Sequence, residues 1–198
     1  MLVRLMMLMA LLPAAVRAEE RPPILPSRDV DITYIVPTPA GATRQHLRFN
    51  AERQLLRLDP PGGGIYVIID FAAGRMSTVR DADRSVIEMT APKTWMPGLG
   101  QAHYTRRNTS TVAGVPCTEW QTTDSEGRDV RICLDHDGVM LRVNLHGNSG
   151  AATLAVAVER HAEPQAPALF QVPTAYRRLA PPPMPGASMP GASMPGAR

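Results

Sequence analysis

Polar and apolar residues alternate with a period of two along most of the chain between residues 29 and 179. In the first such segment, Val30, Ile32, Tyr34 and Val36 occupy every second position, with polar residues at 29, 31 and 33. This spacing places the apolar side chains on one face of a half-buried strand. No segment has a long apolar period of 3.6 residues, so helix should be minor, and we expect it around 91–101.

Turns rich in glycine, proline, aspartate or asparagine divide this region into about ten short segments. The segment 65–71 is apolar on both faces, which indicates a strand inside the sheet. Gly147–Gly150 indicates a hairpin turn. Short strands at such regular spacing predict a mainly β domain, built as a sheet, a sandwich or a barrel. The other predicted strands cover 43–50, 53–59, 75–80, 85–90, 117–122, 128–134, 139–145 and 154–158.

The start of the chain, 1–18, has the three-part layout of a secretory signal. Arg4 provides the positive charge, 5–12 form an unbroken apolar run, and Val16-Arg17-Ala18 ends in a small residue suited to cleavage. The run is short for a permanent membrane span, although a membrane anchor is the alternative interpretation. No cysteine lies near the cleavage point, which argues against a lipoprotein. We expect a periplasmic or secreted protein with no stable membrane span after signal cleavage.

Proline-rich segments flank the predicted β domain at 29–179. Residues 19–28 are typical of an extended N-terminal arm. Residues 180–198 repeat a Met-Pro-Gly-Ala motif and have almost no bulky apolar side chains, so the cost of ordering predicts a disordered tail. Its methionines at 184, 189 and 194 are soft ligands that could bind Cu(I). A low-complexity extension is the simpler interpretation.

The two cysteines, Cys117 and Cys133, are expected to pair, because an exported chain meets an oxidising environment. They lie in two predicted strands that flank a turn at 124–127. If the two cysteines lie directly opposite each other, the same strand register also places charged residues opposite charged residues and apolar residues opposite apolar residues. Such a disulfide stabilises by about 3 kcal/mol, whereas a catalytic dithiol or a metal site needs other spacing or further ligands. The remaining predicted pairs are Glu119 with Arg131, Gln121 with Asp129, Trp120 with Val130 and Thr118 with Ile132.

Charge and residue types argue against several classes of function. The formal charge of +3 becomes +1 without Arg4 and Arg17 of the signal, and the remaining charges are interspersed. With few aromatic residues, this composition does not support nucleic-acid binding. Histidines 46, 103, 136, 146 and 161 have no metal-binding spacing. Asp135–Gly138 resembles the start of a calcium loop, but the later bidentate acid is missing and a hairpin needs a turn there.

No motif for a phosphate-bearing cofactor or for haem attachment occurs, so no cofactor and no metal are expected. An enzyme would need an unrecognised acid–base pair, such as Asp70 with His103. The apolar segment Trp95–Leu99 interrupts the strands beside helix-breaking residues. It either covers an apolar opening in a curved sheet, as in ligand-binding β folds, or plugs one end of an ordinary core.

Short motifs spread over 29–179 carry a family resemblance. They are Leu47–Phe49, Leu56–Asp59, Ile68–Phe71, Thr111–Trp120, and Ala168–Pro173 with Tyr176. Together they resemble a bacterial envelope domain family of unknown function that is similar to the lipoprotein carriers LolA and LolB. The resemblance implies a single curved antiparallel sheet, a half-barrel, whose apolar concave face holds lipoprotein acyl chains in the carriers. The carriers open with an amphipathic helix, which a proline-rich arm replaces here, and aromatic residues are scarce.

We therefore expect a non-enzymatic periplasmic protein that serves binding or envelope maintenance through an apolar concave face. A lipid, an acyl chain or an envelope protein is the expected partner. The alternative is a structural or protein-interaction module that uses its sheet edges and C-terminal tail. The residues expected to form the apolar ligand surface are Tyr34, Phe49, Tyr66, Ile68, Trp95, Met96, Leu99 and Trp120.

Overall fold

A computed structural model describes residues 21–91, 103–124, 126–147 and 150–181. The predicted signal, nearly all of the C-terminal repeat and the segment Trp95–Leu99 lie outside these ranges, as does the helix expected around 91–101 beyond its first residue. Within the described part of the chain, no helix has the length and apolar character needed to cross a bilayer.

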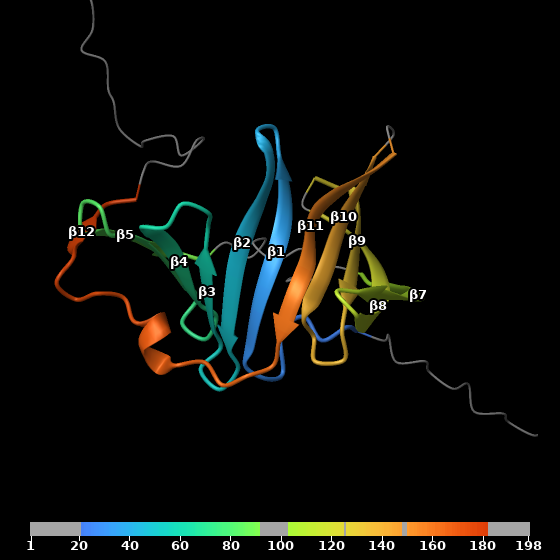
Figure 1. The fold of residues 1–198 in the computed structure, drawn as a ribbon, viewed down its shortest axis with the longest axis horizontal. Coiled ribbons are helices and arrows are strands. Elements are labelled where there is room, and N and C mark those ends of the chain that lie inside the picture. The colour runs from blue at the N-terminus through green and yellow to red at the C-terminus, as the bar shows by residue number, and fades with distance from the viewer. Residues whose placement is uncertain (1–20, 92–102, 125, 148–149, 182–198) are drawn as a thin grey trace, which may run out of the picture.

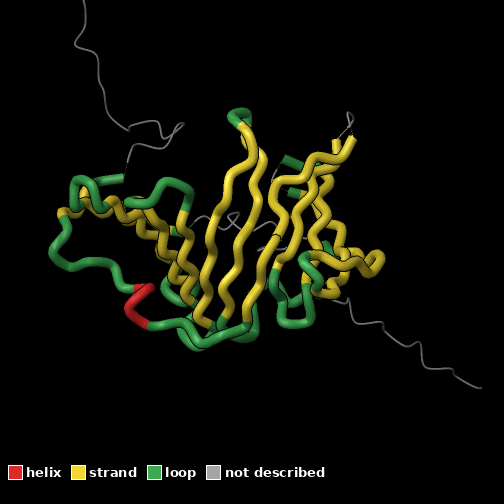
Figure 2. The backbone as a smooth tube through the Cα atoms, in the orientation of Figure 1, coloured by secondary structure: helices red, strands yellow, loops and turns green. Residues whose placement is uncertain are grey.

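The described residues form one sheet of 12 strands, drawn in Figures 1 and 2. Its order is β12-β6-β5-β4-β3-β2-β1-β11-β10-β9-β8-β7, and only β12, which pairs with β6, runs parallel to its neighbour. The strands and the 3₁₀ helix are β1 (Val30–Thr38), β2 (Gly41–Asn50), β3 (Leu55–Asp59), β4 (Ile65–Asp70), β5 (Arg75–Arg80), β6 (Ser85–Thr90), β7 (Thr105–Val112), β8 (Val115–Thr123), β9 (Asp129–Leu134), β10 (Met140–Gly147), β11 (Gly150–His161), η1 (Pro167–Phe170) and β12 (Arg177–Leu179).

The sheet is curved and does not close. In Figure 1 the central strands β1 and β11 stand nearest the viewer, while the strands toward either edge recede. The view is therefore onto the convex face, over which η1 lies. This architecture confirms the predicted fold class, a mainly β half-barrel made of one antiparallel sheet with little helix.

Strand alternation assigns side chains to the two faces. Arg57 of β3 donates to the carbonyl oxygen of Leu169 in η1, which places Arg57 on the convex face. Its neighbours Leu56 and Leu58 therefore face the concave side. Register extends the concave face to Phe49 and Leu47 of β2, and from there to Val30, Ile32 and Tyr34 of β1 and Ile69 of β4.

The concave face is the principal apolar core. Val30, Ile32, Phe49 and Ile69 are 0–1% exposed, and Phe49 packs against Phe71 with ring centroids 6.3 Å apart. Burial of such side chains contributes about 1.5–3 kcal/mol each. The alternation first seen in β1 thus marks the face that carries the larger apolar cluster.

On the convex face, the C-terminal segment 165–179, here called the C-terminal strap, covers a second apolar cluster. The covered residues on β4, β5 and β6 are Tyr66, Ile68, Val79 and Val86, and the strap contributes Val172 and Tyr176. The strap ends in β12, which pairs with β6 at the edge of the sheet. Strand β4 therefore has apolar contacts on both faces, as its sequence predicts.

Cys117 and Cys133 form the expected disulfide, but the predicted register of β8 and β9 is wrong by two residues. Glu119, not Cys117, lies opposite Cys133. The cause is the turn, in which the Asp124 carboxylate accepts the N–H groups of Glu126 and Arg128. This tight turn lets pairing begin at Thr123 and Asp129. The observed pairs are Gln121 with Arg131, Trp120 with Ile132, Thr118 with Leu134 and Thr122 with Val130.

Candidate functional site

A hollow with a mainly apolar lining, here called the concave cavity, lies beside the packed core of the concave face. Its volume is about 190 Å³. Its eight lining residues come from β1, β2, β3, β10 and β11. Seven of them have an aliphatic, methionine or tyrosine side chain, and the eighth is Gln45. The lining residues are Tyr34, Gln45, Leu47, Leu56, Leu58, Met140, Val143 and Ala155.

Tyr34 gives this cavity its one fixed polar contact. The Tyr34 hydroxyl donates a hydrogen bond of 2.5 Å to the carbonyl oxygen of Met140, which ties β1 to β10 across β11. Burial raises the pKa of Tyr34, and the nearby negative charge of Asp135 raises it further. The phenol therefore stays neutral and presents its ring to the cavity. Gln45 supplies an amide at the same wall.

The cavity is small for a complete ligand. Sites that bury a drug-sized molecule usually hold about 300–1,000 Å³, whereas this one holds about 190 Å³. It has room for one large apolar side chain or part of an alkyl chain. The mostly aliphatic lining offers burial without a directional partner, apart from Gln45, so the arrangement is suited to binding and carries no acid–base pair.

The structure brings together only part of the predicted ligand surface. Tyr34 lines the cavity, Phe49 lies in the core beside it, and Trp120 lies farther along the same face, where it packs with Ile132 and Val143. Tyr66 and Ile68 lie on the opposite, convex face under the C-terminal strap. Trp95, Met96 and Leu99 lie outside the described residues.

Several cavity residues were missed by the sequence-based prediction. Leu47 and Leu58 lie opposite each other and alternate with polar residues in β2 and β3. This alternation could have identified them as residues of the apolar face. Val143 and Ala155 reach the same face only because bulges shift the registers of β10 and β11. A bulge changes the face of every following residue. Period-two alternation places Val143 in the apolar phase of 139–145, but in 154–158 it favours Leu154 and Val158, which are 43% and 39% exposed, over Ala155.

The acidic segment Asp135–Gly138, which resembles the start of a calcium loop, forms the turn between β9 and β10. The Asp135 carboxylate accepts the N–H groups of Asp137 and Val139 at 2.9 and 2.8 Å. Arg160 pairs with both Asp135 and Asp137, and Arg28 lies 3.0 Å from Asp137. Two arginines thus balance two buried carboxylates, although Asp135 Oδ2 meets Arg160 as an ion pair at 3.0 Å and has no hydrogen bond among the described residues. The predicted interpretation as turn chemistry fits this geometry.

The convex face carries a balanced ladder of charges across β1, β2 and β3. Arg48 bridges Asp31 and Asp59, and Arg57 binds Asp59. His46 lies in the same ladder: its Nδ1 faces an Arg48 donor at 2.7 Å and its Nε2 faces Asp31 at 2.6 Å. Because arginine only donates, Nδ1 accepts and Nε2 carries the hydrogen. Both ring nitrogens therefore have structural partners.

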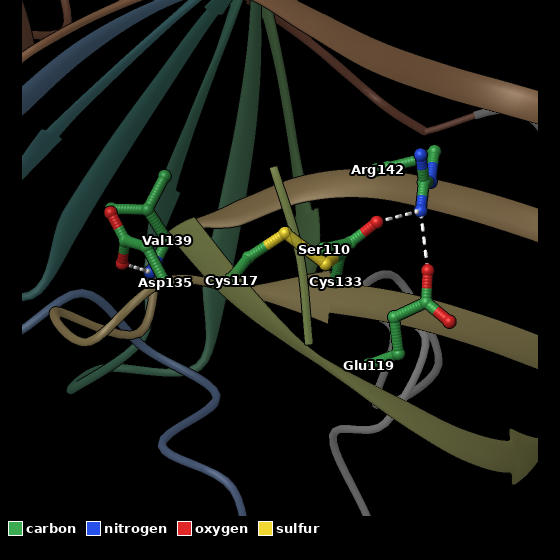
Figure 3. The surroundings of a disulfide bond; sticks show 7 residues. All are labelled: Ser110, Cys117, Glu119, Cys133, Asp135, Val139 and Arg142. Carbon is green, nitrogen blue, oxygen red and sulfur yellow. Dashed lines mark hydrogen bonds and ion pairs between the residues drawn. A yellow bond between two sulfur atoms is a disulfide. The ribbon is translucent and has the colours of Figure 1, made fainter. Parts of the chain in front are cut away.

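Another ion pair adjoins the disulfide (Figure 3). Arg142 of β10 pairs with Glu119 of β8, and the same guanidinium donates to Ser110 of β7 at 3.1 Å. Cys133 lies between Glu119 and Arg142 in the register of the three strands. The arrangement ties four neighbouring strands together. Asp70, which an enzyme would need to pair with a base such as His103, accepts the N–H of Ala73 and pairs with Arg75. Both are contacts within the turn between β4 and β5.

Comparison with known proteins places the fold among solved structures. No protein-family model and no curated protein matches the chain. An uncharacterized conserved protein from Thermus thermophilus superposes with a TM-score of 0.58 at 13% identity, covering 78% of this chain and 91% of that one. MucB superposes with a TM-score of 0.54 at 15% identity, covering 78% of this chain and 60% of MucB.

A complex of Pseudomonas aeruginosa MucA/MucB gives a TM-score of 0.52 at 17% identity, over 73% of this chain and 56% of the matched one. The chain therefore spans less than two thirds of the MucB chains it matches. PNGF-II also superposes, with a TM-score of 0.53 at 10% identity. Several different proteins thus share this sheet at low sequence identity. The similarity is one of fold, a curved, open β half-barrel common to this chain, MucB and the Thermus protein.

Proposed function

We propose that this protein is a non-enzymatic binding module of the periplasm, which takes an apolar group of its partner into the concave cavity. The observation that carries the proposal is the cavity itself, a hollow of about 190 Å³ with a mainly apolar lining beside the packed core. Its size fits one apolar side chain of a protein partner or one stretch of an acyl chain. The proposed export rests on the signal pattern at 1–18 and on the Cys117–Cys133 disulfide, which suits an oxidising compartment.

A protein partner is supported by one neighbour in particular. MucB, which has this fold, has been solved in complex with MucA. By fold analogy alone, a protein segment with an apolar anchor is the partner class that we favour over a free lipid. The small volume points the same way, because burying one anchor side chain in a pocket is how protein interfaces gain most of their affinity.

The test is to fill the cavity from β11. Ala155→Leu adds an apolar side chain to the cavity wall, whereas Ala151→Leu makes the same change at an exposed position of the same strand. Binding of a single-chain lysophospholipid and of envelope proteins is measured for both by native mass spectrometry and pull-down. The proposal expects Ala155→Leu to lose binding and Ala151→Leu to keep it. Equal binding by the two variants, or no binding by the unmodified protein, refutes it.

The second candidate function is a protein-interaction module that uses sheet edges and the C-terminal repeat. Edge strand β7 favours it, because six of its eight residues are exposed and an edge strand can pair with an added strand. Deleting residues 181–198 separates the two functions. A cavity binder keeps its partners after the deletion, while a module that depends on the repeat loses them.

A further inference from the structure

The convex face holds a second hollow, which the proposed function does not use. It lies between the C-terminal strap and strands β3 to β6, and we call it the strap cleft. Its volume is about 340 Å³, within the range of about 300–1,000 Å³ found for small-molecule sites. Leu55, Ile68 and Phe170, each 3–5% exposed, form its apolar floor.

Defined contacts hold the strap wall of this cleft in place. The Arg57 guanidinium donates to the Leu169 carbonyl oxygen at 2.9 Å, directly before Phe170. The same guanidinium lies 3.8 Å from the centre of the Tyr66 ring. Farther along, the Tyr176 hydroxyl donates to Asp81 at 3.0 Å. The strap is thus fixed on both sides of the cleft, and the space between strap and sheet is a built feature.

Among the charged side chains that the structure describes around the cleft, those of Asp70 and Glu88 have partners and that of Arg53 has none. Asp70 pairs with Arg75 at 3.4 Å, and Glu88 pairs with Arg178 at 2.9 Å. Arg53 also lines the cleft, yet within the described ranges its guanidinium has neither a hydrogen bond nor an ion pair; only its backbone N–H is bonded, to Asn50. An apolar floor therefore meets a guanidinium whose donors have no partner among the described residues.

We propose that the strap cleft binds a molecule in which a compact apolar body carries a carboxylate. The body would lie on Leu55, Ile68 and Phe170, and the carboxylate would meet the Arg53 guanidinium, which binds two oxygen atoms side by side. A short aliphatic acid has this chemistry, and so does the C-terminus of a peptide that ends in an apolar residue. The proposal is independent of the concave cavity, which lies on the other face of the sheet.

The test titrates the complete mature chain by NMR with two matched pairs of probes. One pair is octanoate and octanamide; the other is an acetylated tripeptide ending in leucine, as the free acid and as the amide. We expect each acid to bind about fivefold or more tightly than its amide, with shifts centred on Leu55, Ile68 and Phe170. The pair with the larger difference shows which of the two sources of a carboxylate, an aliphatic acid or a peptide C-terminus, the cleft prefers.

Arg53→Gln should abolish the preference for the acid, and Arg53→Lys should restore part of it. Arg44→Gln, which removes the same charge from the exposed end of β2, should leave the preference unchanged. The proposal is overturned if acid and amide bind equally, if Arg53→Gln binds like the unmodified protein, or if no probe binds at millimolar concentration. Shifts centred on Leu47 and Val143 would also overturn it. Ala155→Leu should not affect this binding, so the two proposals fail separately.

Discussion

Cys133 lies directly opposite Glu119 in the β8–β9 ladder, and its disulfide reaches diagonally to Cys117 with the two Cα atoms 5.5 Å apart. This separation is within the usual range for a disulfide. The two cysteines are 4% and 1% exposed, so the bond is shielded from attacking thiolates. Its position between two strands makes it a structural cross-link.

Replacing both cysteines with alanine should lower the free energy of unfolding by about 3 kcal/mol, because the bond closes a loop of 16 residues in the unfolded chain. Urea denaturation of the mature protein measures the loss. Dithiothreitol present throughout the urea series reduces the bond once the chain unfolds, so it should destabilise the unmodified protein by a similar amount and leave the double variant unchanged. A double variant as stable as the unmodified protein would show that the bond is dispensable.

Arg142→Met should cost more than the loss of an ordinary surface charge, because it leaves Glu119 without a partner although that side chain is only 19% exposed. We expect about 1–3 kcal/mol. A double-mutant cycle with Glu119→Gln should give a coupling of about 0.5–3 kcal/mol. Arg128→Met is the matched control, because the Arg128 side chain is 50% exposed and Asp124 keeps the backbone N–H groups of residues 126 and 128 as partners after the change; this loss should be at most about 1 kcal/mol. Equal losses at both arginines would contradict the assignment.

The sequence was sufficient for the disulfide but not for its register. A shift of two residues keeps every side chain on the same face of its strand, so Cys117 and Cys133 stay within reach in both registers. What selects the register is the Asp124 carboxylate, which binds two backbone N–H groups of the turn. The wrong register looked plausible because it placed Glu119 opposite Arg131. The observed partner of Glu119 is Arg142, which lies on a third strand, β10, and therefore has no place in the pairing of two strands.

The same limit applies to the faces of the sheet. The alternation in β1 and β2 correctly separated apolar from polar positions, but in β4 both phases are apolar, and the pattern does not say which phase faces the concave side. Tyr66 and Ile68 were therefore grouped with Tyr34, although they lie on the opposite face. Strand β7 was missed because its exposed, polar residues carry no periodic signal; it becomes visible only through its pairing with β8.

Gly138→Ala should destabilise the protein more than glycine replacement at an open turn. Gly138 has φ +84°, and an added Cβ would lie 2.7 Å from the carbonyl oxygen of Leu25 in the N-terminal arm. Gly127→Ala is the matched control, because Gly127 has φ +75° with open space around it. Both variants lose about 1 kcal/mol or more from backbone strain, and the excess at Gly138 measures the arm contact. Limited proteolysis should then cut near Leu25 faster in Gly138→Ala alone.

Arg57→Met should loosen the C-terminal strap, because Arg57 bonds the Leu169 carbonyl and lies over the Tyr66 ring. We expect a loss of about 1–3 kcal/mol and faster proteolysis within 165–179. Arg178→Met removes only the exposed pair with Glu88 and should change stability by less than about 1 kcal/mol. If both variants are cleaved at the same rate, Arg57 does not anchor the strap.

Alkaline pH should destabilise the fold through Tyr34. Burial holds the pKa of Tyr34 above its ordinary value near 10, so the folded protein keeps a proton that the unfolded chain releases. The contribution of Tyr34 to stability is therefore constant below about pH 9, and above pH 10 it falls by about 1.4 kcal/mol per pH unit. Urea unfolding at successive pH values measures the slope. Tyr34→Phe should be less stable at pH 7, because the hydrogen bond to Met140 is lost, yet its stability should fall less steeply above pH 10. An unchanged slope would show that Tyr34 ionises as freely in the folded protein as in the unfolded chain.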